Sequence, residues 1–128
     1  MSLEEAIARV TAARQAGADA SFVEAPTSRE QMGEIGKRSP HPNVANMIEN
    51  GRTPLLDRGE LESLGFQLIL YPLSGLFAAA KALQEIYEKL HRDETTQGMF
   101  DRLSSFERFN ELIGVEEKYR LAERFGVK

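Results

Sequence analysis

Residues 66–71, Phe-Gln-Leu-Ile-Leu-Tyr, form a nearly continuous apolar run. Such a run is typical of a parallel strand that is covered on both faces, because a one-sided antiparallel strand would alternate apolar and polar residues. Two shorter strand-like runs precede it, at residues 20–24 and 43–47. Helical patterns separate the three runs, and strands that alternate with helices indicate right-handed βαβ units in a parallel sheet. The sequence therefore predicts an α/β fold.

Helical signals surround these strands. Ser2 with Glu5, and Thr27 with Glu30, have the spacing of a capping box, in which each side chain satisfies a free amide at a helix start. We expect helices over about residues 3–16, 26–36, 58–64 and 74–92, followed by two shorter helices on either side of Gly114. The longest helix is expected to bury an apolar stripe formed by Leu76, Ala80, Leu83, Tyr87 and Leu90.

Three strands are few for a parallel sheet. A three-stranded sheet leaves two edges unpaired, whereas a (β/α)₈ barrel needs roughly 250 residues and this chain has 128. Phe100, Phe106 and Phe109 in the tail are also too apolar to be left in water. The sequence therefore indicates a piece of a larger α/β fold, or a small sheet that a partner completes.

Composition excludes several classes of protein. The formal net charge is −4, so the chain lacks the basic balance that attracts nucleic acid. No stretch approaches the roughly 20 apolar residues of a membrane span, and the acidic start is unlike a signal peptide. The absence of cysteine excludes disulfides, thiolate metal sites and cysteine nucleophiles. We therefore expect a soluble cytoplasmic protein without a nucleic-acid or membrane partner.

Polar residues at the ends of the predicted strands are the candidates for a site. In parallel α/β folds ligands bind at the carboxyl ends of strands, which here are Glu24, residues 46–49 and residues 71–74. A carboxylate such as Glu24 can hold Mg²⁺ directly or through water, and the amide of Asn46 can bind a substrate carboxylate. A polar residue at a strand end is also commonly an ordinary loop residue or helix cap, so both interpretations stay open.

Other polar residues do not indicate a site. The sequence contains no glycine-rich phosphate loop and no histidine pair at metal-ligand spacing. His41 and His91 are expected to be solvated surface residues, and residues 50–52 are expected to form an ordinary turn.

Residues 44–55, Val-Ala-Asn-Met-Ile-Glu-Asn-Gly-Arg-Thr-Pro-Leu, resemble the A-N-M-x-E-x-G-x-T-P segment of the isocitrate lyase and phosphoenolpyruvate mutase superfamily. Residues 70–74 are similar to the last barrel strand of that superfamily and its following turn, and residues 17–25 to the strand before these. The tail over residues 106–114 also fits. The resemblance therefore runs over nearly the whole chain.

This resemblance implies the carboxyl-terminal half of a (β/α)₈ TIM barrel, namely its last three βα units and closing helices. The βα units would occupy about residues 1–98 and the helices about residues 99–128. Members of the superfamily are lyases and related enzymes that act on 2-oxo or 2-hydroxy carboxylic acids through an enolate stabilised by Mg²⁺. They cleave or form C–C or C–P bonds, or decarboxylate.

The resemblance also implies roles for individual residues. Glu24 corresponds to the acid that orients the water shell of the metal. Asn46 corresponds to the amide that binds the substrate carboxylate, with Met47 and Ile48 beside it. The direct metal ligands, the mobile lid and an essential arginine belong to the first half of the barrel, so no catalytic residue is assigned within this chain.

Two positions bear on the branch of the superfamily. Members that cleave 2-methylisocitrate carry arginines where this chain has Phe77 and Phe106. The resemblance therefore points to the branch of oxaloacetate decarboxylases and carboxyphosphonoenolpyruvate-mutase-like proteins. It also implies exchange of C-terminal helices between barrels, so we expect a homo-oligomer.

Three hypotheses remain open on the sequence alone. The chain is the carboxyl-terminal half of a Mg²⁺-dependent carbon–carbon lyase or decarboxylase and is inactive by itself. Alternatively, it is a non-catalytic half-barrel remnant that acts as a self-association module. A third hypothesis is a structural α/β domain unrelated to the superfamily.

Overall fold

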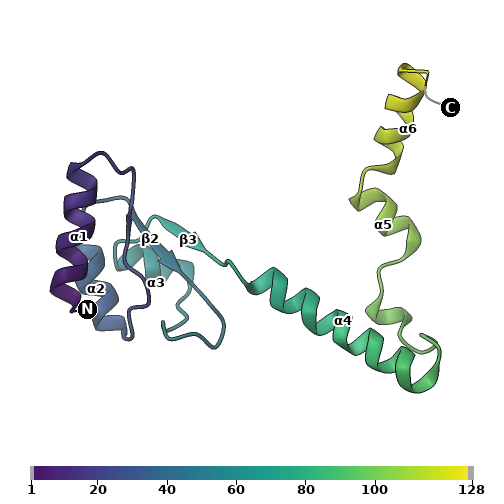
Figure 1. The fold of residues 1–128 in the computed structure, drawn as a ribbon, viewed down its shortest axis with the longest axis horizontal. Helices are drawn as coiled ribbons and strands as arrows, with labels where there is room; N and C mark the ends of the chain where they lie inside the picture. The colour runs from purple at the N-terminus through teal and green to yellow at the C-terminus, as the bar shows by residue number, and fades with distance from the viewer. Residues whose placement is uncertain (1, 127–128) are drawn as a thin grey trace. The chain divides into compact units, whose positions relative to one another are not determined.

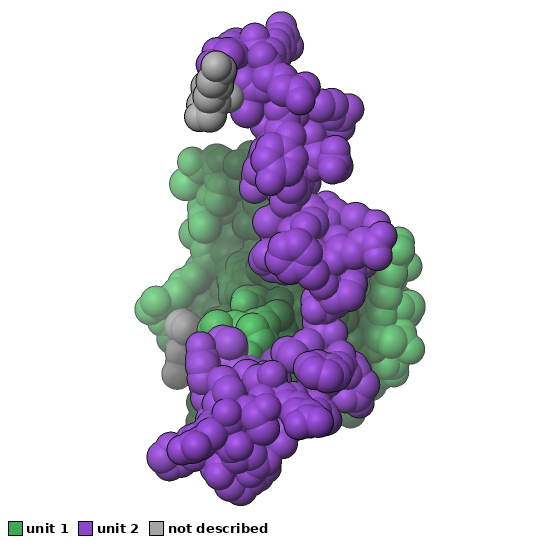
Figure 2. Space-filling model, turned by 90° about the vertical axis from the view of Figure 1, so that its right-hand side faces the viewer, with its two compact units in different colours: residues 1–80 green, residues 81–128 purple. Residues whose placement is uncertain are grey.

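A computed structural model describes residues 2–126 and divides the chain into two compact units, residues 1–80 and 81–128 (Figures 1 and 2). Unit 1 contains α1 (Leu3–Gln15), β1 (Ser21–Phe22), α2 (Arg29–Arg38), β2 (Asn43–Asn46), α3 (Arg58–Ser63), β3 (Leu68–Leu70) and the start of α4 (Ser74–Asp93). Unit 2 contains the rest of α4, the 3₁₀ turn η1 (Phe100–Arg102), α5 (Phe106–Leu112) and α6 (Val115–Arg124). The boundary that the resemblance implies near residue 98, between the βα units and the closing helices, stays a prediction.

The three strands form one parallel sheet in the order β1-β2-β3, as predicted. Phe22 pairs with Val44 between β1 and β2, and Val44 pairs with Leu68 between β2 and β3. The assigned strands are shorter than the apolar runs in the sequence. Since side chains alternate along a strand, these paired residues share one face of the sheet.

The helices α2 and α3 cover the other face. Ala45 and Met47, which alternate with Val44 and Asn46 along the chain, point to this helical side. The main core consists of six buried residues that come from α2, the β2 segment, α3 and the start of the third strand segment: Met32, Ile35, Ala45, Met47, Leu61 and Phe66. Helix α1 contacts β1 and packs against α2 (Figure 1).

We call the face of the sheet opposite this core the inner face; Val44 at its centre is buried, whereas the outer strands are open within unit 1. Phe22, Leu68 and Leu70 lie on it and are 39%, 48% and 45% exposed. Within unit 1, the expectation that residues 66–71 are covered on both faces is therefore not met. The apolar pattern is that of a doubly covered strand, but helices of unit 1 supply only one of the two layers.

Side-chain hydrogen bonds close the amino-terminal edge of the sheet. Asn43 is fully buried, and its Nδ2 donates to the carbonyls of Gly36 at 3.3 Å and Gly65 at 3.2 Å. Ser21 is also buried, and its Oγ donates to the Pro40 carbonyl at 2.6 Å. These bonds satisfy backbone acceptors at the ends of helices, so the polar residues at this edge have structural roles.

The helix starts differ in detail from the sequence prediction. The capping box expected from Thr27 is wrong: Ser28 is the N-cap of α2 and its Oγ accepts a hydrogen bond from the Gln31 amide at 3.2 Å. A complete capping box instead starts α3, where Asp57 and Glu60 each accept a hydrogen bond from the other's amide. The competing serine next to Thr27 explains the one-residue error.

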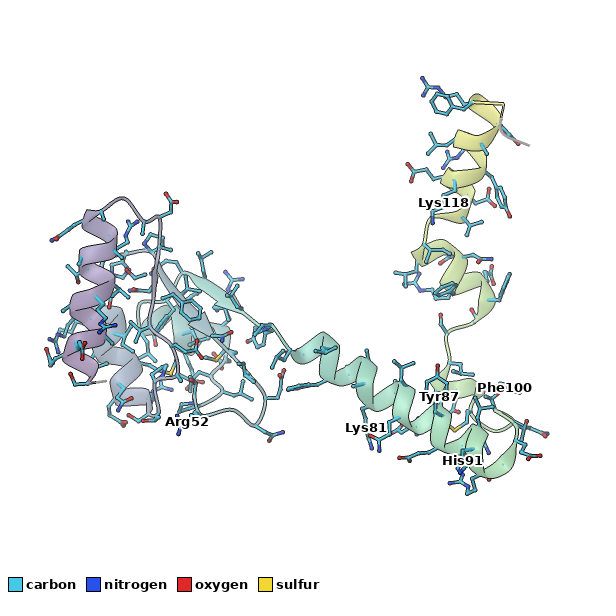
Figure 3. All side chains as sticks on the ribbon, viewed as in Figure 1. Arg52, Lys81, Tyr87, His91, Phe100 and Lys118 are labelled. Carbon is cyan, nitrogen blue, oxygen red and sulfur yellow. The ribbon has the colours of Figure 1, made fainter. Side chains whose placement is uncertain are left out.

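The apolar stripe of α4 is exposed. Within unit 2, Leu83 and Tyr87 are 54% and 64% exposed, so the other elements of this unit do not supply the expected burial of the stripe (Figure 3 labels Tyr87). In the tail, the predicted helices on either side of Gly114 are present, and Phe106 at the start of α5 is 82% exposed. Among residues 2–126, no helix is long and apolar enough to span a lipid bilayer.

Candidate functional site

Asn46 is the last residue of β2. It lies at the end of the sheet where the carboxyl ends of the parallel strands meet, which we call the carboxyl edge. It pairs with Leu70 and lies on the inner face, away from the helical core. The residue is half-buried, and its Oδ1 is inaccessible to water and accepts no hydrogen bond within the described part of the chain. Buried polar atoms in native proteins are almost always paired, and Oδ1 of Asn43 at the other end of β2 is unpaired as well, so it is the inner-face position of Asn46 that distinguishes the two amides.

The two residues after Asn46 are placed differently. Met47 is fully buried in the core on the helical side, and its amide donates to the Leu70 carbonyl at 2.8 Å. A contribution of Met47 to ligand binding is therefore confined to its backbone carbonyl. Ile48 is half-buried, and its carbonyl accepts a hydrogen bond from the Gly51 amide at 3.0 Å. This bond closes the predicted turn, in which Arg52 is exposed (Figure 3).

Glu24 follows β1 and is exposed. It lies two residues beyond Phe22, as Asn46 lies two residues beyond Val44, so the two polar residues end neighbouring strands. The backbone at Ala25 has a φ of +54°, an uncommon conformation for a residue with a side chain. The loop over residues 23–27 and parts of α1 and α2 line an open pocket of about 250 Å³ whose wall includes Glu24.

The described residues do not by themselves form a magnesium site. Among residues 2–126, no group of three or more acidic or histidine side chains could hold a metal ion. Mg²⁺ requires near-octahedral oxygen coordination and commonly keeps several waters. The role that the sequence resemblance implies for Glu24, contact with the metal through its waters, stays a prediction.

Glu49 and Ser74 form a contact that the sequence analysis did not single out. Ser74, the first residue of α4, donates a hydrogen bond from Oγ to Oε1 of Glu49. Together with a hydrogen bond from the Glu49 backbone, this contact lowers the pKa of the Glu49 carboxyl. In the sequence, both residues lie in segments that follow predicted strands. Only the three-dimensional fold shows that a side-chain hydrogen bond joins the segments after β2 and β3.

This contact predicts a pH effect. Because the folded-state pKa of Glu49 is lowered, ionised Glu49 stabilises the fold above its ordinary pKa, and this contribution is lost as the pH falls through the lowered value. Ser74→Ala should raise the pKa of Glu49, as measured by carbon NMR titration of its carboxyl. Ser63→Ala, whose hydroxyl bonds instead to the Glu60 carbonyl, is the control. An unchanged Glu49 titration in Ser74→Ala would contradict this assignment.

The two histidines are exposed to solvent, as the sequence predicts. His41 and His91 are both exposed, and the Nδ1 atom of His41 is 3.1 Å from Oε1 of Gln67 at the amino-terminal edge. Phe77 in unit 1 and Phe106 in unit 2 are exposed as well.

The two edges of the sheet thus have different chemistry. The amino-terminal edge is closed by structural hydrogen bonds around Asn43, whereas Asn46, Glu49 and Ser74 gather at the carboxyl edge. Polar residues at the carboxyl ends of parallel strands, with structural residues at the opposite end, are typical of the class of parallel α/β proteins, which includes α/β barrels. The phosphoenolpyruvate phosphomutase family model matches residues 1–91, and the chain belongs to this family within the isocitrate lyase and phosphoenolpyruvate mutase superfamily.

Two curated relatives show the extent of the similarity. The chain is 41% identical over 115 residues to 2,3-dimethylmalate lyase of Eubacterium barkeri, covering 90% of this chain and 40% of that protein. It is 43% identical over 123 residues to the chloroplastic carboxyvinyl-carboxyphosphonate phosphorylmutase of Arabidopsis thaliana, covering 96% of this chain and 36% of that protein. The chain therefore spans well under half of the length of these relatives.

Solved structures agree on the fold. A crystal structure of 2,3-dimethylmalate lyase matches with a TM-score of 0.80 and 33% identity, covering 94% of this chain and 42% of that one. Oxaloacetate acetylhydrolase, solved with the inhibitor 3,3-difluorooxalacetate, matches with a TM-score of 0.83 and 31% identity, covering 98% of this chain and 42% of that one. The α/β fold of this chain is thus the last three βα units and closing helices of a TIM barrel, as the sequence resemblance implies.

Proposed function

We propose that this chain is the carboxyl-terminal part of a Mg²⁺-dependent lyase that acts on a 2-oxo or 2-hydroxy carboxylic acid through an enolate. The observation that carries the proposal is the position of Asn46, an amide that ends β2 on the inner face of the sheet, in a chain that belongs to the phosphoenolpyruvate phosphomutase family. The relatives that support it are lyases and mutases, and this chain covers less than half of each.

In this proposal the side chains of the carboxyl edge bind and orient a small carboxylic acid. The Asn46 amide donates to a substrate carboxylate, with Met47 and Ile48 beside it. Glu24 contacts the waters of a Mg²⁺ ion whose direct ligands come from the rest of the barrel, where the cation supplies Lewis-acid stabilisation of a developing negative charge. The parent enzyme would be cytoplasmic and homo-oligomeric through its C-terminal helices.

The chain alone should have no lyase or decarboxylase activity, because the described residues offer no direct metal site. The purified chain is expected to release no pyruvate from oxaloacetate in the presence of Mg²⁺, measured against Glu24→Ala as the background control. Turnover above that control would show that the rest of a barrel is not required.

A complete barrel tests the proposed function itself. In a chimera, this chain replaces the matching segment of 2,3-dimethylmalate lyase from Eubacterium barkeri, with which it is 41% identical. We expect Mg²⁺-dependent turnover of oxaloacetate or 2,3-dimethylmalate, and little of 2-methylisocitrate, because Phe77 and Phe106 cannot pair with a third carboxylate. A folded chimera that prefers 2-methylisocitrate would contradict the assigned branch.

The second candidate function is a non-catalytic self-association module. The observation in its favour is apolar area that the chain leaves exposed, which includes Phe106 and Phe109 of α5 at 82% and 48%. Burying such area contributes roughly 25 cal/mol per Å² before the costs of association. Light scattering at micromolar concentration should then give a dimer or larger species, whereas a monodisperse monomer would exclude this candidate.

A further inference from the structure

The pairing of β2 with β3 ends on a backbone hydrogen bond directly after Asn46. The Met47 amide donates to the Leu70 carbonyl at 2.8 Å, and beyond this bond the two strands part. The last bond of a strand ladder opens more readily than the bonds inside it, because it has a neighbouring bond on one side only. The placement of Asn46 therefore depends on what holds the segment that follows.

That segment starts with a tight turn, which contains Glu49. The Gly51 amide donates to the Ile48 carbonyl at 3.0 Å, and Asn50 has a φ of +57°. Asparagine adopts this left-handed conformation more readily than most residues that carry a side chain. A Cβ atom at Gly51 would lie 3.2 Å from the Cβ atom of Ile48, so the turn is closely packed. The backbone of the turn therefore restricts the direction of the Glu49 side chain.

One side-chain hydrogen bond connects this turn to the next βα unit. Among residues 2–126, the bond from Ser74 Oγ to Glu49 Oε1 is the only hydrogen bond that joins residues 48–56 to another segment. Ser74 is the first residue of α4, and the positive end of a helix dipole favours a carboxylate at this place. The other carboxylate oxygen of Glu49, Oε2, is inaccessible to water. The carboxylate is thus held at the start of α4 rather than in solvent.

We propose that Glu49 and Ser74 form a positioning pair, which fixes the end of β2 so that the Asn46 amide is held in place for a substrate carboxylate. The inference rests on the proposed function, in which Asn46 binds that carboxylate. Without the Ser74 hydroxyl, the bond between Met47 and Leu70 would hold the strand end alone, and the Asn46 amide would sample several directions. A group misplaced by about 1 Å can cost up to roughly 100-fold in rate, so a looser strand end should lower catalysis measurably.

Hydrogen exchange of the 128-residue chain, followed by NMR, tests the positioning without any turnover. Ser74→Ala should speed the exchange of the Met47 amide about tenfold, because the end of the ladder then opens more often. The Gln67 amide is the internal control, since it donates to the Asn43 carbonyl at 3.0 Å at the amino-terminal edge, and its rate should not change. Ser74→Thr keeps the hydroxyl and should restore slow exchange at Met47.

Steady-state kinetics of the chimera test whether the pair acts through Asn46. Ser74→Ala should lower kcat/KM roughly tenfold, and Ser74→Thr should retain it, because threonine keeps the donor. In an Asn46→Ala background, Ser74→Ala should change kcat/KM by less than about twofold, because the group that the pair positions is already gone. Ser63→Ala, whose hydroxyl donates to the Glu60 carbonyl, is the matched control and should leave kcat/KM unchanged.

Two results would overturn the proposal. In the first, Ser74→Ala leaves the exchange of Met47 unchanged, or speeds the exchange of Gln67 equally. In the second, Ser74→Ala lowers kcat/KM as much in the Asn46→Ala background as in the parent chimera, which would show that Ser74 acts independently of Asn46. Glu49→Ala removes the same bond from its other partner and replaces Ser74→Ala if that variant does not fold. An inactive chimera would refute the proposed function, and the exchange rates would still decide whether the pair fixes the end of β2.

Discussion

Gly36→Ala should prevent unit 1 from folding. A Cβ atom at Gly36, in α2, would lie 1.7 Å from the carbonyl oxygen of Leu64 at the end of α3. The atom in the way belongs to the backbone, so the two helices must separate. The Asn43 hydrogen bonds to the carbonyls of Gly36 and Gly65 would break with them. We expect a loss of about 4–5 kcal/mol or more, which is in the exceptional range for one substitution.

Thermal unfolding of the 128-residue chain followed by circular dichroism measures this effect. Gly33→Ala, one turn earlier in α2, is the matched control, because its Cβ would meet only the Leu64 Cδ2 atom at an ordinary 3.5 Å. Alanine is the better helix former, so this control should stabilise the chain by about 0.5–1 kcal/mol. If Gly36→Ala melts within a few degrees of Gly33→Ala, the packing of α2 on α3 is wrong.

Asn46→Ala should abolish most catalysis in the chimera while leaving its stability nearly unchanged. The Asn46 side chain makes no hydrogen bond to another described residue, and its buried Oδ1 is unpaired, so its removal breaks no structural bond. If its amide binds the substrate carboxylate, kcat/KM should fall by roughly 100-fold, in line with the loss of one positioned donor. The free energy of unfolding should change by less than about 0.5 kcal/mol.

The same strand provides the opposite control. Asn43 is fully buried at the amino-terminal edge and donates to two backbone carbonyls. Asn43→Ala should cost about 1–3 kcal/mol of stability, because it leaves buried acceptors unpaired, while the turnover of the folded fraction is retained. Steady-state kinetics and thermal melts of both variants decide between the roles. Equal losses of stability and turnover in Asn46→Ala would contradict a binding role.

The element order could be read from the sequence because its causes are local. The apolar runs at residues 43–47 and 66–71, separated by helical periodicity and turn residues, are sufficient to predict parallel βα units. The N-cap of α2 was predicted one residue too early, at Thr27 instead of Ser28, because the two residues have nearly the same capping chemistry.

Burial and side-chain contacts could not be predicted in the same way. The apolar patterns of β3 and α4 are those of covered segments, but Leu70 is exposed within unit 1 and Tyr87 within unit 2. An apolar pattern indicates that a segment can be buried and does not indicate which element covers it. The bond between Glu49 and Ser74 joins two strand ends that are 25 residues apart in sequence. Asn46 was identified through the resemblance to a family, and its unpaired Oδ1 became visible only in the structure.

The most direct test of the central claim is the initial rate at which the chimera cleaves 2,3-dimethylmalate in the presence of Mg²⁺. The claim is that this chain supplies the carboxyl edge of a lyase barrel and needs the remaining βα units to act. It predicts turnover within roughly 100-fold of 2,3-dimethylmalate lyase itself, since most binding energy is retained, and none from the chain alone. A cooperatively folded chimera without measurable Mg²⁺-dependent turnover of 2,3-dimethylmalate or oxaloacetate would contradict it.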